Sequence, residues 1–206
     1  MYQPNKYKKQ DPDYLFKFLE QHPFASFILK GKQFLATHVP VLLEGNPQNF
    51  RLYSHIANHN EMLKYLVNDT EALLIFQGAH GYISSSWYEE KDISTWDYSA
   101  VHVNVKLKLQ TREELESSLD NLVHKFGNDQ DKPLYYKDIP KRMLQDHLPL
   151  ITGFWAEPVK IEGVAKLHQS YKKRDVESVI RHLDEGDAMS KELANKIREE
   201  NNGDNK

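Results

Sequence analysis

The sequence predicts an α+β protein that is mainly antiparallel β, built as a closed or split β-barrel with peripheral helices. Two observations carry this prediction. Over residues 101–109, five aliphatic side chains alternate with polar ones, which is the period of a strand with one buried face. Elsewhere, short segments rich in β-branched and aromatic residues are separated by turn signals, and the helical stripes are few. A barrel-like sheet with helices around it satisfies both observations.

The individual elements follow from local signals. Helices are expected where a capping residue precedes an apolar stripe, namely after Asp11-Pro12, near Asn58 or Asn60 through 61–67, after the capping box Thr111-Arg-Glu-Glu114 up to Gly127, and from Asp175. Strands are expected over 24–30, 33–44, 50–56, 72–77, 82–87, 101–109 and 154–167. The first three of these strands are predicted to form a meander, because only short turns separate them.

Length and composition limit the class of protein. The chain has 206 residues, which suits one elaborated domain, predicted over 1–183, followed by an acidic helix or tail over 184–206. The absence of cysteine excludes disulfides, a thiolate nucleophile and Cys-ligated metals. No apolar run approaches the ~18 residues of a membrane span, and residues 1–10 are polar. We therefore expect a cytoplasmic protein that has no membrane partner.

Common catalytic and metal-binding patterns are missing. His55 and His59 have the spacing of a zinc-protease helix, but no glutamate follows the first histidine, so no metal site is predicted. The three serines at 84–86 do not form a nucleophile elbow, and glycine-rich phosphate loops are absent. The net charge of −3 is unlike that of a non-specific nucleic-acid binder. No catalytic residue is assigned on this basis.

The stretch 77–102 is the most informative part of the chain. It combines five aromatic residues with several serines and two histidines. Aromatic faces and hydroxyl groups are the residue types that hold a flat ligand with a phosphate tail. An aromatic mini-core beneath a long loop would have the same composition, so both interpretations stay open.

Several phrases resemble those of a known family. They are ATHVP (36–40), YSHIAN (53–58), FQGAHGYISSSWY (76–88), TWDYSAVH (95–102) and IEGVAKLHQ (161–169), together with MYQP (1–4) and HPFA (22–25). They follow one another with family-like spacing over residues 1–183. In these phrases the sequence resembles the PaiB family.

The resemblance implies a bacterial, cytoplasmic homodimer with the FMN-binding split barrel of pyridoxamine-phosphate-oxidase-like proteins. It also implies a negative transcriptional regulator, a repressor of protease production and sporulation. Carried over motif by motif, the implied FMN-binding residues are Thr37, His38, His55, His80, Tyr82, Ser84, Trp87, Tyr88, Trp96, Tyr98, His102, Lys166 and Gln169. This sequence differs from the family motifs at six positions, Ser54, Glu61, Ala79, Ser85, Ser170 and Tyr171. At the last of these, Tyr171 replaces an arginine.

Three functions follow, and the regulator is favoured over an enzyme. The regulator would contact DNA directly or through a regulatory protein, and its candidate DNA surface is the run Lys172, Lys173 and Arg174, for which a solvated charged face is the alternative. The second function is an FMN-dependent oxidoreductase or haem-handling enzyme of the split-barrel class, with His38, His80 or His102 as proton donor or haem ligand. The third is a flavin-free dimer that acts through protein contacts.

Overall fold

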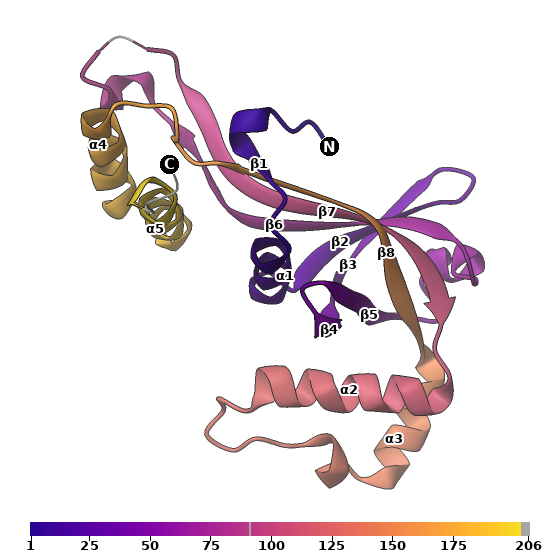
Figure 1. The fold of residues 1–206 in the computed structure, drawn as a ribbon. Coiled ribbons are helices and arrows are strands. Elements are labelled where there is room, and N and C mark those ends of the chain that lie inside the picture. Colours follow the sequence, from indigo (N-terminus) through magenta and orange to yellow (C-terminus); the bar gives the residue numbers. More distant parts are fainter. Residues whose placement is uncertain (91, 203–206) are drawn as a thin grey trace. The chain divides into compact units, whose positions relative to one another are not determined.

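The computed structural model describes residues 1–90 and 92–202. Its centre is one antiparallel sheet of eight strands in the order β3-β2-β6-β7-β8-β5-β4, with β1 pairing with β8 (Figure 1). The strands are β1 (Lys8–Lys9), β2 (Phe24–Lys30), β3 (Phe34–Pro40), β4 (Leu42–Asn46), β5 (Asn49–Ala57), β6 (Glu71–Ile83), β7 (Thr95–Leu109) and β8 (Ile151–Lys166). The predicted α+β, mainly antiparallel class is confirmed.

Helices occupy the connections and the C-terminal part of the chain. The α-helices are α1 (Pro12–Gln21), α2 (Arg112–Gly127), α3 (Lys141–His147), α4 (Lys173–Asp184) and α5 (Ala188–Asn202). Short 3₁₀ helices are η1 (Asn5–Tyr7), η2 (Glu61–Tyr65), η3 (Ser85–Trp87), η4 (Tyr136–Asp138) and η5 (Leu148–Leu150). The capping box predicted at Thr111 and Glu114 is present, with both reciprocal hydrogen bonds made. In the described part of the chain, no helix is long and apolar enough to cross a membrane.

The chain forms two compact units, each assembled from separate stretches. The first unit comprises Met1–Phe18, Phe76–His102 and the described residues from Glu162 on, and the second comprises Leu19–Ile75 and Val103–Ile161. Strands β6, β7 and β8 each contribute residues to both units. The predicted domain boundary at 183/184 stays a prediction, and the two compact units are divided at other positions in the sequence.

The core of the second unit is built from residues of β2, β5, β6, β7 and β8. Phe27 and Phe154 are fully buried there and their rings stack, with centroids 4.9 Å apart. Leu52, Leu74 and Leu107 are buried as well. On the strand of the clearest alternation, the aliphatic residues at 101, 103, 105 and 107 are buried, as the sequence predicts, whereas the fifth, Leu109, is 39% exposed at the end of β7.

The predicted meander is wrong. Residues 33–44 form two strands, because β3 ends at Pro40 and pairs with β2, whereas β4 pairs with β5 at the other end of the strand order. Proline has no N–H for a ladder hydrogen bond, so the strand ends there. The next amide, Val41 N, donates to Pro23 O at 2.7 Å instead.

Two further predicted elements differ in type. The expected helix over 61–67 is the shorter η2, although Asn60 caps it as expected by accepting from Met62 N. The strand expected over 82–87 is also wrong, since β6 continues from Glu71 to Ile83 and Ser85–Trp87 is η3. The Ser84 hydroxyl accepts from Ser86 N, which favours a helical turn over an extended strand at this point.

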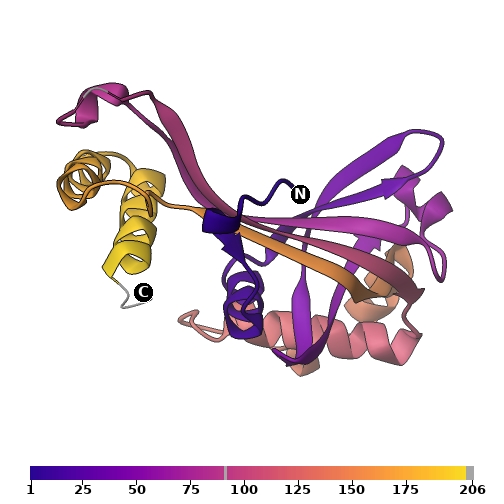
Figure 2. The same cartoon turned by 45° about the horizontal axis from the view of Figure 1, so that its top comes forward.

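The first unit has a core of its own. Helices α4 and α5 lie side by side in both views (Figures 1 and 2) and bury Val179, Leu193 and Ile197 completely. These side chains pack with Ala79 and Ile83 of β6 in one cluster. The C-terminal helix therefore contributes apolar residues to the core of this unit.

Candidate functional site

An exposed aromatic surface lies where β6 and β7 run together in the first unit. Trp96 and Tyr82 are 51% and 53% exposed, and their ring centroids are 6.3 Å apart. Trp96 Nε1 donates to His80 Nδ1 at 3.2 Å. Since indole N–H is only a donor, this bond leaves the hydrogen of a neutral His80 on Nε2. Residues 80 and 82 share one face of β6 because side chains alternate along a strand. We call His80, Tyr82 and Trp96 the aromatic surface.

A lysine from β8 joins this region to β7. Lys166 Nζ donates to Trp96 O at 2.9 Å and to the hydroxyl of Thr95. It also lies 3.7 Å from Asp97 Oδ1, and its side chain is 21% exposed. Lys166 thus fixes the backbone beside Trp96 and balances the charge of a buried carboxylate.

Behind the aromatic surface lies a buried relay of Asp97, His168 and Tyr88. His168 Nδ1 is hydrogen-bonded to Asp97 Oδ2, and His168 Nε2 lies 3.0 Å from the Tyr88 hydroxyl. Asp97 and His168 are essentially inaccessible, and burial raises the pKa of the Tyr88 phenol. His168 adopts a left-handed backbone with φ of 62°, which is uncommon for a residue other than glycine. We call these three residues the relay.

Sequence reasoning assigned no role to Asp97 or His168. Strand parity could have found the first one, because Asp97 shares its face of β7 with Ser99, Val101 and Val103, and all of these are buried. An aspartate on the inward face of a strand requires a buried partner. No such periodic signal marks His168, which lies in the loop after β8.

Tyr171 stands where the resemblance expects an arginine. Its ring stacks on Tyr88 with centroids 5.4 Å apart and on His168 at 4.2 Å. Burial raises the pKa of its phenol. The position therefore supplies an aromatic face and a hydroxyl to the relay, and it supplies no cation.

Other predicted cofactor residues of the first unit have partners within it. Trp87 stacks on His182 with an interplanar angle of 8°, and Ser84 caps η3. Gln169 Nε2 donates to Ala165 O and to Glu200. Tyr98 is half-buried, as is His102, whose pKa is lowered by burial and by the nearby N-terminal amine. The assignment of these residues to a cofactor stays a prediction.

The remaining three predicted cofactor residues belong to the second unit. Thr37 is half-buried on β3, and the neighbouring His38 is exposed and stacks on Phe24 at 5.9 Å. His55 is half-buried on β5, and burial lowers its pKa. The predicted set therefore divides between the two units.

The basic run at the start of α4 is paired with acidic side chains. Lys172 Nζ lies 2.6 Å from Glu90 Oε1, and Arg174 pairs with both Glu89 and Glu90. Lys173 is 3.8 Å from Glu177 on the same helix. The positive charge that this run could offer to a nucleic-acid phosphate is therefore largely balanced by neighbouring carboxylates. Within residues 1–90 and 92–202, no cluster of three or more His, Cys, Asp or Glu side chains could hold a metal ion.

Comparisons with known proteins identify the family of the chain. The family model described as "Putative FMN-binding domain" matches residues 1–162. The protease synthase and sporulation protein PAI 2 of Bacillus subtilis is 28% identical over 197 residues, which cover 94% of this chain and 95% of that protein. An uncharacterised protein of Saccharomyces cerevisiae is 34% identical over 74 residues, which are 33% of this chain and 44% of that protein.

Solved structures show the same fold. The FAD and haem binding protein of Mycobacterium smegmatis superposes with a TM-score of 0.59 at 13% identity, over 84% of this chain and 80% of that chain. A flavocytochrome of Azotobacter vinelandii gives a TM-score of 0.59 at 14% identity, over 85% and 77% of the two chains. These likenesses confirm the predicted split barrel. Because the family model covers most of the sequence and the Bacillus subtilis relative matches along nearly its whole length, the chain belongs to the PaiB family of FMN-binding-domain proteins.

Proposed function

We propose that this protein is a homodimeric, cytoplasmic FMN-binding regulator that lowers transcription, at DNA directly or through a partner protein. The regulator role is supported by the match to the Bacillus subtilis protein, whose name links it to protease synthesis and sporulation. The flavin part is supported by the family model and by one observation above all: the exposed, hydrogen-bonded Trp96 beside Tyr82. Because this ring surface is already held in place before binding, little conformational entropy is lost when a flat ligand packs on it.

The residues of this region fit FMN by their chemistry. Trp96 and Tyr82 offer exposed ring faces to a flat ring system, and His80 keeps a hydrogen on Nε2 that can be donated. Lys166 provides a partly exposed cation for the phosphate. Bound FMN would supply a redox-active ring. The protein's residues would hold and orient it, and Lys166 would interact with both the phosphate and the Asp97 carboxylate.

Lys166 has a larger part in this proposal than the resemblance implies. Tyr171 brings no cation, and Lys172 is paired with Glu90. Among the cofactor residues predicted from sequence, Lys166 is the single lysine or arginine. Thr37, His38, His55 and the other residues named from the sequence remain predicted FMN-binding residues.

Loss of the Trp96 ring should remove most of the flavin affinity. We expect FMN fluorescence to be quenched saturably on titration with the purified protein, with about one FMN per subunit. Trp96→Ala should weaken binding about tenfold or more, because the stacking surface and the anchoring bond to His80 are both lost. The matched control is Phe126→Ala, which removes a partly exposed aromatic ring from α2. Equal affinity of wild type and Trp96→Ala would place the flavin elsewhere, and a folded protein that takes up no FMN would favour the flavin-free dimer.

The paired basic run should contribute little to DNA binding. A duplex of random sequence and about 30 base pairs can serve as probe, with binding measured between low and physiological salt. We expect the triple variant Lys172→Ala, Lys173→Ala, Arg174→Ala to change the slope of log K against log salt by less than about 1, because each cation already has a carboxylate partner. The double variant Lys106→Ala, Lys108→Ala serves as control. A drop in the slope of about 3 would show that the run meets phosphates.

An enzyme is the second candidate. The two solved structures named as binding FAD and haem, or as a flavocytochrome, favour an FMN-dependent oxidoreductase or haem-handling protein of the same fold. The exposed His38 would be a candidate proton donor or haem ligand. Oxidation of NAD(P)H or turnover of haem by the FMN-loaded protein would support the enzyme over the regulator.

A further inference from the structure

Strands β2 and β6 of the second unit are apolar on both of their faces. With β3 they follow one another at one end of the strand order (Figure 1). Over 24–29 of β2 and 72–75 of β6, Ser26 is the single polar residue. A strand with one face in water usually alternates apolar and polar residues, whereas a continuous apolar run is typical of a strand that is covered on both faces. The sequence of these strands therefore indicates two covers.

Only one of the two faces is buried. The inner face carries buried residues from all three strands, namely Ala25, Phe27, Leu29, Leu35, Val39, Ala72 and Leu74. The strand register places on the opposite side, which we call the outer face, Phe24, Ser26, Ile28 and Lys30 of β2, Phe34, Ala36, His38 and Pro40 of β3, and Leu73 and Ile75 of β6. None of these side chains is buried, and the rings of Phe24 and Phe34 are 66% and 77% exposed. The part of the chain that the structure describes therefore leaves the outer face without a complete cover.

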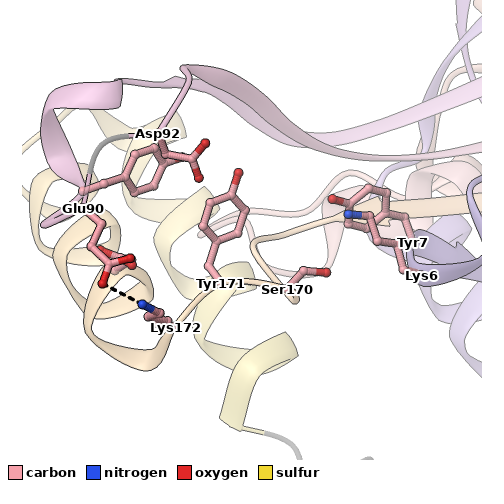
Figure 3. Close-up of a pocket in the computed structure, with 9 residues that line it drawn as sticks. Lys6, Tyr7, Glu90, Asp92, Ser170, Tyr171 and Lys172 are labelled. Carbon is pink, nitrogen blue, oxygen red and sulfur yellow. Dashed lines mark hydrogen bonds and ion pairs between the residues drawn. The ribbon is translucent and has the colours of Figure 1, made fainter.

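We propose that the outer face is covered by the same face of a second copy of this chain, with β2 of one copy lying over β6 of its partner. The inference rests on the homodimer of the proposed function and adds the surface at which the two copies meet. It does not involve the pocket of about 360 Å³ in Figure 3, which belongs to the first unit and has a polar, charged lining.

The size of the outer face suits the centre of a dimer interface. Strands β2 and β3 have seven residues each. Three such strands cover roughly 14 by 23 Å, because strands lie about 4.8 Å apart and rise about 3.3 Å per residue. Phe24 and Phe34 each add on the order of 100 Å² of exposed ring surface. Since a standard interface buries about 800 Å² per partner, with an apolar centre and a polar rim, the outer face supplies the centre and its flanks supply the rim.

The charges at one end of the outer face are complementary when the face meets itself. Lys30 ends β2 and Glu71 begins β6, and the register that pairs Leu29 with Ala72 brings Lys30 and Glu71 level. Both side chains are exposed, and among the described residues no ion pair engages either of them. A two-fold axis parallel to the strands, midway between β2 and β6, sets Lys30 of each copy opposite the partner's Glu71.

The same axis brings the apolar rows together. Ile28 and Leu73 are register partners within one copy, so the axis sets Ile28 opposite the partner's Leu73. Ser26 and Ile75 are likewise register partners, which sets Ser26 opposite the partner's Ile75. No like charges oppose each other in this arrangement. A face that is complementary to itself in both charge and apolarity favours a second copy over an unrelated protein as its cover.

The first test places a charge at the centre of the outer face. The oligomeric state of the full-length protein is measured by light scattering over a range of concentrations, in buffer that contains FMN. We expect a dimer whose dissociation constant rises about a hundredfold or more in Ile28→Asp, because each copy would bury an unpaired carboxylate. The control Val67→Asp places the same charge at a 53% exposed position of the same unit that lies outside the outer face, and it should dimerise like wild type. Thermal unfolding shows whether each variant keeps its fold.

The second test uses only exposed side chains, so it stands even where Ile28→Asp fails to fold. Lys30→Glu and Glu71→Lys should each weaken the homodimer about fivefold or more, because like charges then oppose each other twice. A mixture of the two variants should restore dimerisation as heterodimers, since every opposed pair again has opposite charges. Native mass spectrometry with one variant isotope-labelled counts the heterodimers. Charge pairs within one copy are unchanged by mixing, so recovery reports on contacts between copies.

The outcomes separate this inference from the proposed function. A wild-type protein that stays monomeric would overturn both the homodimer and the assignment of its surface. A wild-type dimer that a folded Ile28→Asp protein forms equally well would leave the homodimer standing and place its interface elsewhere. A statistical mixture of homodimers and heterodimers, with no preference for the complementary pair, would overturn the arrangement of β2 over β6.

Discussion

Replacement of Asp97 by alanine is expected to lower the free energy of unfolding by about 3–5 kcal/mol. Asp97 is fully buried, accepts from His168 and lies 3.7 Å from Lys166 Nζ. Alanine would leave the imidazole N–H without an acceptor and the lysine charge without its partner. Removing one partner of such a group is costly, because the His168 N–H left behind is fully buried and the Lys166 ammonium has lost most of its water.

The measurement is urea unfolding followed by tryptophan fluorescence, in which Trp87 and Trp96 report on the first unit. The matched control is Glu157→Ala, an exposed carboxylate whose loss should change stability by less than about 0.5 kcal/mol. Asp97→Asn should fall between the two, since the amide oxygen still accepts from His168 but the charge opposite Lys166 is gone. A loss below about 1 kcal/mol for Asp97→Ala would mean that His168 and Lys166 find other partners.

The relay also shows where sequence reasoning ends. Alternation along β7 predicts which residues face inward, and Asp97 obeys it. His168, which binds Asp97, however, lies 71 residues from it in the sequence, and Tyr88 lies 80 residues from His168. No local pattern encodes such separations, because the pairing is decided by which strands become neighbours.

Glycine gives a second example. The sequence predicts separate strands over 72–77 and 82–87, with Gly81 between them, yet β6 runs through Gly81 to Ile83. A Cβ at this position would lie 3.0 Å from a methyl carbon of Leu193. The glycine therefore permits close packing of α5 on the strand, which is the other common reason for glycine within a strand. Only the position of the helix distinguishes the two cases.

The stretch 77–102 contains one part that is packed and another that is exposed. Trp87 and Tyr88 belong to the packed interior, on His182 and His168, as an aromatic mini-core would. Trp96 and Tyr82 remain half-exposed on the strands. Composition cannot separate them, because aromatic residues serve both purposes and exposure depends on the helices that cover one part of the stretch and leave the other open.

Leu193→Ala is expected to lower the free energy of unfolding by about 2–5 kcal/mol. Leu193 is fully buried in the cluster that α4, α5 and β6 share. Its side chain lies against Gly81 and packs with Ala79 and Ile83 of β6, a strand that is hydrogen-bonded to neighbours in the sheet. The cavity left by alanine should therefore stay open, which places the loss in the upper part of the range.

Met189→Ala is the matched control, because it lies on the same helix but is 45% exposed, and its cost should stay below about 0.5 kcal/mol. Urea unfolding of the full chain gives both values. A large difference between the two variants would mean that residues beyond 183 stabilise the first unit, and that a domain ending there would expose Ile83 and Val179 to water. Equal small losses would instead support the boundary predicted from sequence, because the helix would then contribute little to the stability of the unit on which it packs.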